Sequence, residues 1–207
     1  MDITTWLAFV AASTLLLLLP GPTVLLVLSY ALTQGRRVAL ATVAGVALGD
    51  AVAMTASLAG LGALVLASAE LFTVLKWVGA AYMVYLGVQL LRSAGGARFE
   101  ASTEAPAVRA NSVFVHAAAV TALNPKSIAF FIAFAPQFVD TSAPLAPQFA
   151  LMITTFVGLA AMNALTYALL ADKLRQKLQR PSVIQWLTRI GGGALITMGA
   201  ATAAASR

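Results

Sequence analysis

The chain has no cysteine and only one histidine, His116. Without a thiol it cannot form a disulfide, a cysteine nucleophile or a thiolate metal site, and one histidine cannot build a histidine-rich metal centre. Charge is also scarce, because Asp, Glu, Lys and Arg make up 10% of the 207 residues, against about 25% in a soluble globular domain. We therefore expect no metal ion and no other cofactor, and too little polar surface for a soluble globule.

Apolar residues occupy most of the chain. They make up 60% of it, and two long stretches, Ile3–Gly35 and Thr141–Ala171, carry no charge. Each stretch is longer than the roughly 20 residues that cross a bilayer core about 30 Å thick. Asp2 precedes the first stretch where a signal peptide has a basic segment, and no small-x-small cleavage site follows it, so we interpret the stretch as a retained span. The sequence predicts a multi-pass protein of a lipid bilayer.

Hydropathy divides the chain into six candidate transmembrane helices, at roughly 5–33, 38–67, 73–92, 112–138, 146–170 and 187–205. A linker at 93–111, rich in Gly, Ala, Ser and charged residues, separates three spans from three within a single transmembrane domain over residues 1–207. An odd number of spans in each half inverts the second half relative to the first. The predicted fold is an all-α membrane protein of two inverted three-helix repeats, at about 1–92 and 112–207.

Two features recur in the two halves. The first span is interrupted in its middle by Pro20-Gly21-Pro22, and the fourth by Asn124-Pro125. The third and sixth spans share a cation followed by two glycines eight residues apart, namely Lys76, Gly79 and Gly87 in one and Arg189, Gly191 and Gly199 in the other. Kinking prolines also occur in transmembrane helices that have no site. Interruptions at matching places in two halves nevertheless indicate a transport site.

Basic residues gather on one predicted side of the membrane. The loops after spans one, three and five, with their edges, contain Arg36, Arg37, Arg92, Arg98, Arg109, Lys173, Arg175, Lys177, Arg180 and Arg189. The other side has Lys76 and Arg207, and Lys126 lies within a span. This bias places the basic loops in the cytoplasm and both termini outside. Because the cations sit in short loops between apolar segments, the net charge of +6 does not indicate a nucleic-acid surface.

Asp50 and Lys126 are the two charged residues predicted to lie deep within spans. Asp50 is about 12 residues, or roughly 18 Å, into span two, and Lys126 is about 14 residues into span four. The proline interruptions fall at the same level. A charge at the bilayer centre costs about 2.5–3.5 kcal/mol, so it is seldom kept without a partner or a water-filled path.

These groups together match a zwitterionic amino acid. Asp50 offers an anion to an ammonium group, whereas Lys126 and backbone N–H groups beside the interruptions offer donors to a carboxylate. The predicted substrate site consists of Pro20, Gly21, Pro22, Asp50, Asn124, Pro125 and Lys126. A structural ion pair between Asp50 and Lys126 is the alternative, and the two interpretations are compatible if the substrate inserts between the charges.

Other polar and small residues within the spans have simpler interpretations. Gly45 and Gly49 form a Gly-x-x-x-Gly spacing, which predicts close packing of helices. Asn163 is predicted either to line a cavity or to form a hydrogen bond between helices. His116, near the cytoplasmic end of span four, is predicted to be interfacial.

Three segments carry a resemblance to a known family. They are LLPGPTVLLVLSYALTQGRRVALATVAGVALGD, KWVGAAYMVYLGVQLLRS and TALNPKSIAFFIAFAPQFVD. In this order they resemble the lysine-exporter family of the LysE/RhtB type, which includes homoserine, threonine and leucine exporters. The resemblance runs over nearly the whole chain, and its motifs include the site residues named above. It implies a secondary exporter of amino acids driven by the proton gradient.

We expect the chain to export amino acids across a bacterial inner membrane by proton antiport. A second ammonium, as in lysine, would lie near Lys126 without a counter-ion, which favours neutral amino acids of the homoserine, threonine or leucine kind. An exporter of basic amino acids, a passive channel and a structural membrane subunit are the alternatives, and a homodimer is left open. An enzyme is not expected, since the chain has no cysteine and no Ser-Lys or Asp-Asp pairing at helical spacing.

Overall fold

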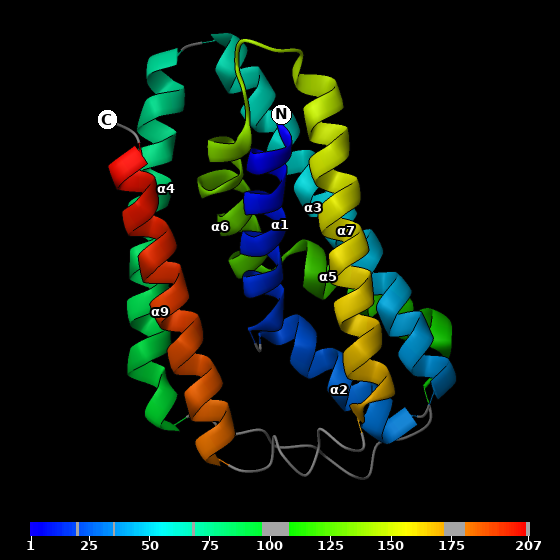
Figure 1. Cartoon of the computed structure of the whole chain (residues 1–207). Coiled ribbons are helices and arrows are strands. Elements are labelled where there is room, and N and C mark those ends of the chain that lie inside the picture. The colour runs from blue at the N-terminus through cyan, green and yellow to red at the C-terminus, as the bar shows by residue number, and fades with distance from the viewer. Residues whose placement is uncertain (20, 35, 68, 97–107, 172–180, 206–207) are drawn as a thin grey trace.

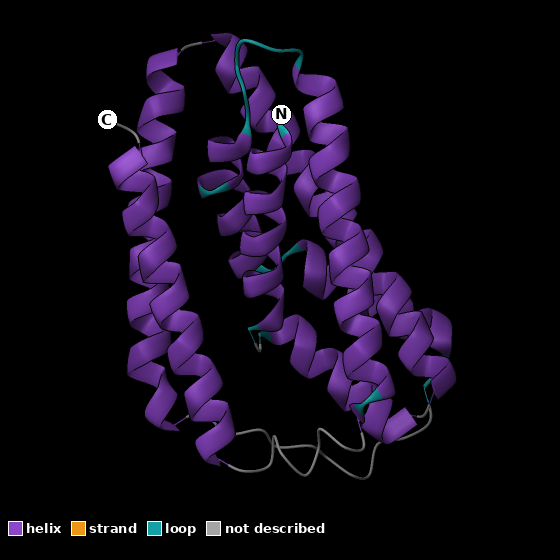
Figure 2. Ribbon diagram, in the orientation of Figure 1, coloured by secondary structure: helices purple, strands orange, loops and turns teal. Residues whose placement is uncertain are grey.

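The computed structural model describes residues 1–19, 21–34, 36–67, 69–96, 108–171 and 181–205, which form helices and no strand (Figure 2). The α-helices are α1 (Ile3–Leu18), α2 (Pro22–Gln34), α3 (Arg36–Ala67), α4 (Ala69–Ser93), α5 (Ala110–Ala122), α6 (Pro125–Ala133), α7 (Leu145–Leu169) and α9 (Pro181–Ala205). Two 3-10 turns, η1 (Ala94–Gly96) and η2 (Ala135–Phe138), follow α4 and α6. The predicted all-α fold is confirmed.

Two of the predicted spans are pairs of helices that meet at a break. α1 and α2 are bent by 55° relative to each other, and α5 is bent by 45° relative to Pro125–Phe138, which comprises α6 and η2. Pro22 and Pro125 are the first residues of α2 and α6. Proline has no N–H and disfavours helical backbone in the residue before it, so it ends one helix and begins the next. Asn124 caps α6, because its Oδ1 accepts the Lys126 N–H at 3.1 Å.

The other long helices are continuous. Val38–Ala63 in α3 and Leu145–Leu169 in α7 are long and apolar enough to cross a membrane. If each broken pair is counted as one span, the described part of the chain has four such segments. α4 and α9 pack against each other at one side of the bundle (Figure 1). Each of the six predicted segments coincides with a helix or a broken pair, although α9 begins earlier than predicted, at Pro181.

Glycines allow the closest contacts between helices. A Cβ atom at Gly45 would lie 2.4 Å from the carbonyl oxygen of Phe114, and one at Gly49 would lie 2.6 Å from that of Ala118. The backbones of α3 and α5 therefore nearly touch, and the Gly-x-x-x-Gly spacing is a packing motif. α4 and α9 approach each other in the same way through glycines of both helices.

A core rich in phenylalanine joins α1, α3, α6, η2 and α7. Its aromatic members are Phe9, Phe130, Phe131, Phe134, Phe138 and Phe156. Their rings contact one another at centroid distances from 4.8 Å to 6.5 Å. Because this cluster holds α1 and α6 in place, it also positions the breaks at their ends.

The two ends of the bundle differ in which segments they contain. The N-terminus, the end of α9 and the loop from η2 to α7 lie toward one end, and the ends of α2, α4 and α7 lie toward the other (Figure 1). Several cations on which the predicted orientation depends lie outside the described residues, namely Arg98, Lys173, Arg175, Lys177, Arg180 and Arg207. The orientation in the membrane stays a prediction.

Candidate functional site

At the break after α1, Lys126 bonds to two main-chain carbonyl groups. Its Nζ atom donates to the Leu19 oxygen at 3.0 Å and to the Leu16 oxygen at 3.2 Å. The last carbonyls of a helix carry its negative dipole end, which attracts a cation. Gly21 allows this approach, since a Cβ atom there would lie 3.1 Å from Lys126 Nζ.

Two side chains of α7 bond to the carbonyls of Leu17 and Leu18, which lie between the two carbonyls that Lys126 contacts. Asn163 Nδ2 donates to the Leu17 oxygen at 3.0 Å, and the Tyr167 hydroxyl donates to the Leu18 oxygen at 3.3 Å. Asn163 and Tyr167 are four residues apart, so they lie on the same face of α7. Together with Lys126, they give each of the four carbonyls at the end of α1 a side-chain partner. For Asn163, the structure shows both predicted roles at once, a bond between helices and a place in a cavity lining.

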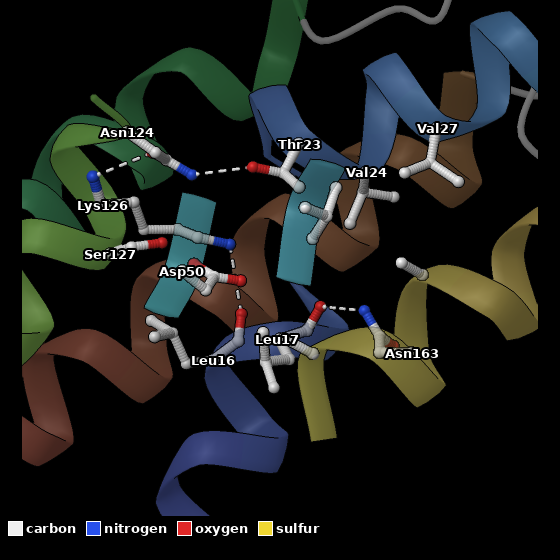
Figure 3. Close-up of a pocket in the computed structure, with 13 residues that line it drawn as sticks. Leu16, Leu17, Thr23, Val24, Val27, Asp50, Asn124, Lys126, Ser127 and Asn163 are labelled. Atoms are coloured by element: carbon white, nitrogen blue, oxygen red, sulfur yellow. Dashed lines mark hydrogen bonds between the residues drawn. The ribbon is translucent and has the colours of Figure 1, made fainter. Parts of the chain in front are cut away.

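A second hydrogen-bonded group joins the two breaks. Asn124 Nδ2 donates to Thr23 Oγ1 at 3.1 Å, and the Thr23 hydroxyl lies 3.5 Å from that of Thr121. Thr23 is in the first turn of α2, and Thr121 is in the last turn of α5. The start of α2, the end of α5 and the start of α6 therefore meet at one place (Figure 3).

Asp50, from the middle of α3, is buried beside these groups. It is 2% exposed, and its Oδ1 atom has no hydrogen-bond partner among the residues that the structure describes. Figure 3 shows the Asp50 carboxylate and the Lys126 ammonium pointing into the same pocket, yet within the described part of the chain the hydrogen bonds of the ammonium go to two main-chain carbonyls. A buried carboxylate oxygen without a partner is unfavourable, so it marks a place for a proton or a cationic ligand.

Two cavities adjoin at the breaks. The narrow one, of about 20 Å³, is lined by Asp50 and by polar groups of Thr23, Asn124, Lys126, Ser127 and Asn163. The wide one, of about 380 Å³, is lined by Leu19, Gly21, Pro22, Leu25, Gln89, Ser93, Asn124, Pro125, Lys126 and Leu195. Asn124 and Lys126 belong to both linings. The volume of the wide cavity is within the range of about 300–1,000 Å³ that is usual for small-molecule pockets.

The structure brings six of the seven predicted site residues to these cavities. Asp50 lines the narrow one, and the wide one is lined by Gly21, Pro22, Asn124, Pro125 and Lys126. Pro20 lies outside the described residues. The prediction missed Thr23, Gln89 and Leu195. The position of Thr23 next to Pro22 was a usable signal, whereas Gln89 and Leu195 reach the cavity only through the packing of α4 and α9.

Two other acids, Asp2 and Asp140, are exposed and line neither of these cavities. The Asp2 carboxylate accepts the Thr5 N–H at 2.8 Å, and this bond lowers the pKa of Asp2. The Ser142 hydroxyl donates to Asp140 Oδ1 at 2.6 Å and the Ser142 N–H does so at 2.9 Å, which lowers the pKa of Asp140. Both acids therefore act as ionised caps of local turns. Asp140 does not fold back toward Lys126.

Comparison with known proteins places this site in a family. The family model described as "LysE type translocator" matches residues 14–206, which include both breaks and both cavities. The chain belongs to the LysE type translocator family.

Several relatives of this LysE chain are similar over most of their length. A homoserine/homoserine lactone efflux protein of Salmonella typhimurium is 32% identical over 200 residues, 97% of this chain and 96% of the relative. An uncharacterized membrane protein of Vibrio cholerae is 33% identical over 199 residues, 96% of each chain. A leucine efflux protein of Salmonella choleraesuis is 28% identical over 163 residues, 79% of this chain and 76% of the relative. No solved structure matches the chain.

The family match confirms the resemblance predicted from the sequence. The LysE family consists of membrane translocators, and the relatives above include proteins named for the efflux of homoserine or homoserine lactone and of leucine. The apolar helices of this chain are compatible with membrane spans, as expected for a translocator.

Proposed function

We infer that this LysE family member exports neutral amino acids across a bacterial inner membrane by proton antiport. The observation that carries the proposal is the buried carboxylate of Asp50, which has an unpartnered oxygen and faces Lys126 where two broken helices meet. The efflux proteins among the relatives support the same substrate class. An intramembrane acid beside broken helices is the usual arrangement of a secondary-transport site.

The two charged ends of an amino acid have separate places in this site. In the proposed complex, the substrate ammonium donates to the unpartnered Oδ1 of Asp50. The carboxylate lies in the wide cavity at the starts of α2 and α6, whose positive dipole ends attract an anion. Lys126 has three ammonium protons, and its bonds to described residues use two of them on carbonyls at the end of α1. In the proposed complex, the third bonds to the substrate carboxylate.

The lining of the wide cavity favours an uncharged substrate side chain. Among the lining residues that the structure describes, Lys126 is the one charged member, and none is an acid. A second ammonium on the substrate would therefore find no counter-ion there, and burying it unpaired would cost several kcal/mol. Leu19, Leu25 and Leu195 provide apolar contacts for a neutral side chain.

Antiport follows if Asp50 binds one partner at a time. A carboxylate that holds the substrate ammonium does not also hold a proton. On the outer side, a proton taken up by Asp50 releases the substrate, and on the inner side, loss of that proton restores the carboxylate for the next substrate. The inward movement of protons down their gradient thereby drives the outward movement of the amino acid.

Contacts between α4 and α9 support the two inverted repeats. If Gly87 is aligned with Gly199, as the glycine spacing indicates, then Ala80 is aligned with Gly192. A Cβ atom at Gly87 would lie 2.5 Å from the Gly192 oxygen, and one at Gly199 would lie 2.7 Å from the Ala80 oxygen. Under this alignment, each of the two contacts corresponds to the other. This is the pattern expected if a two-fold axis relates the two repeats. We propose six crossings in all, with both termini outside.

The test of the function is the Asp50→Asn variant in cells loaded with dipeptides that contain Leu, Thr or Lys. Removal of a buried charge relieves a desolvation cost, so we expect normal accumulation in the membrane but efflux no faster than in cells without the protein. Asp140→Asn is the matched control, because that acid is exposed and lines neither of the two cavities, and it should export like the wild type. Full export by Asp50→Asn would remove Asp50 from the mechanism. Faster efflux of lysine than of both neutral amino acids would contradict the neutral preference.

A further inference from the structure

Gln89, a neutral polar residue, lines the wide cavity but has no part in the proposed binding of the substrate's α-ammonium and α-carboxylate groups. It belongs to α4, and Ser93 lines the same cavity one helical turn later. Asp50 does not line the wide cavity, whereas Lys126 lines both cavities. A substrate held between Asp50 and Lys126 therefore extends its side chain into the wide cavity, toward α4 and α9.

The amide of Gln89 is held at one end. Its Nε2 atom donates to the Tyr85 hydroxyl at 2.5 Å, across one turn of α4. The two ends of an amide are assigned from the hydrogen-bond network, and each end can form a bond of its own. Whichever end bonds to Tyr85, no described residue forms a hydrogen bond with the other end. Tyr85 thus orients the amide and leaves its other end able to form a hydrogen bond with a ligand.

The apolar part of the wall does not discriminate between substrate side chains of similar size. Leu19, Leu25 and Leu195 accept a methyl group, and an apolar pocket also rejects a hydroxyl group of the same size only weakly. A site with an oriented hydrogen-bonding group, in contrast, prefers the substrate that pairs with it, because the analogue leaves the group without a partner. In this cavity Gln89 is such a group.

We propose that Gln89 determines the side-chain specificity of the exporter by hydrogen-bonding a hydroxyl group on a short neutral side chain. The inference rests on the proposed function and specifies its substrate class: neutral amino acids with a side-chain hydroxyl are preferred over aliphatic ones of the same size. Gln89 is exposed, so water competes for the bond. The net value of one hydrogen bond corresponds to a preference of about threefold to tenfold.

The experiment compares two substrates that differ in one group, in everted membrane vesicles with an imposed proton gradient. Homoserine ends in a hydroxyl group, and norvaline has a methyl group in its place. We expect Gln89→Met, which has a similar length and no hydrogen-bonding amide, to lower the homoserine-to-norvaline rate ratio about threefold to tenfold while norvaline transport is retained. Tyr85→Phe removes the hydroxyl that orients the amide, and it should lower the ratio in the same direction by a smaller factor.

Tyr82→Phe is the control for these variants, since Tyr82 is also exposed on α4 but is not part of the cavity lining, and its ratio should equal that of the wild type. An unchanged ratio in Gln89→Met, or an equal loss of both activities, would overturn the inference, because a structural role affects both substrates alike. If Gln89→Met does not accumulate in the membrane, an unchanged homoserine-to-norvaline ratio in Tyr85→Phe would overturn the inference instead. Failure of the wild type to transport either amino acid would instead refute the proposed function.

Discussion

Gly49 and Gly60 lie on the same helix, α3, and the same substitution should destabilise the protein at Gly49 but not at Gly60. An added Cβ atom at Gly49 would lie 2.6 Å from the Ala118 oxygen, 2.7 Å from Thr121 Cβ and 3.0 Å from the Ala122 nitrogen. At Gly60 nothing lies within 4 Å of such an atom. Gly49→Ala therefore forces α3 and α5 apart, whereas Gly60→Ala adds a methyl group to open space.

The expected magnitudes follow from two opposing effects. Replacing Gly by Ala in a helix stabilises it by about 1 kcal/mol, because alanine has less backbone freedom to lose. Overpacking a close contact costs about 1–3 kcal/mol. At Gly49 two of the three close atoms belong to the backbone of α5, so no rotation of a side chain relieves the contact. We expect Gly49→Ala to lower the free energy of unfolding by up to about 2 kcal/mol. Gly60→Ala should leave it unchanged or raise it by up to about 1 kcal/mol.

The assay is unfolding of the purified protein in detergent, by heat or by titration with SDS, followed by the loss of helical circular dichroism. Gly49→Ala should unfold at a lower temperature or a lower SDS fraction than the wild type, and Gly60→Ala should not. Thr121 touches the Gly49 contact and also lies beside Thr23, so the same substitution should reduce export as well. Equal stability of the two variants would refute the close packing of α3 on α5 from which the effect is derived.

The sequence predicts the helices and breaks well because both depend on local properties. Uncharged runs longer than a bilayer crossing mark the spans, and proline interrupts a helix whatever surrounds it. The level of Asp50 and Lys126 could also be counted along their helices, since the rise per residue is constant. For that reason the prediction placed both charges near Pro22 and Pro125, and the structure brings all four residues to the two adjoining cavities.

The bonds within the site could not be predicted, because they depend on how the helices pack. Lys126 bonds to carbonyls at the end of α1, and nothing in the sequence distinguishes this from a direct bond to Asp50. Gln89 is one of several polar residues near the end of α4, and only the position of α4 beside the breaks shows that it lines the wide cavity. Helix contacts of this kind link residues far apart in the chain, so no local pattern contains them.

Two further predictions concern the orientation of the chain and the position of Lys126. Single cysteines can be introduced into this cysteine-free protein and labelled with an impermeant maleimide. A cysteine at exposed Ser142, in the predicted outer loop, should react in intact cells, whereas one at Asn111, at the start of α5, should react only after permeabilisation. The opposite pattern would invert the topology. Gly21→Ala should reduce export without loss of stability. Its Cβ would lie 3.1 Å from Lys126 Nζ, the tip of a flexible side chain, so the ammonium moves aside while the helices stay in place. The displaced ammonium then bonds less well to the α1 carbonyls and to the substrate carboxylate. Wild-type efflux of homoserine by Gly21→Ala, at unchanged unfolding temperature, would show that transport does not depend on this position of Lys126.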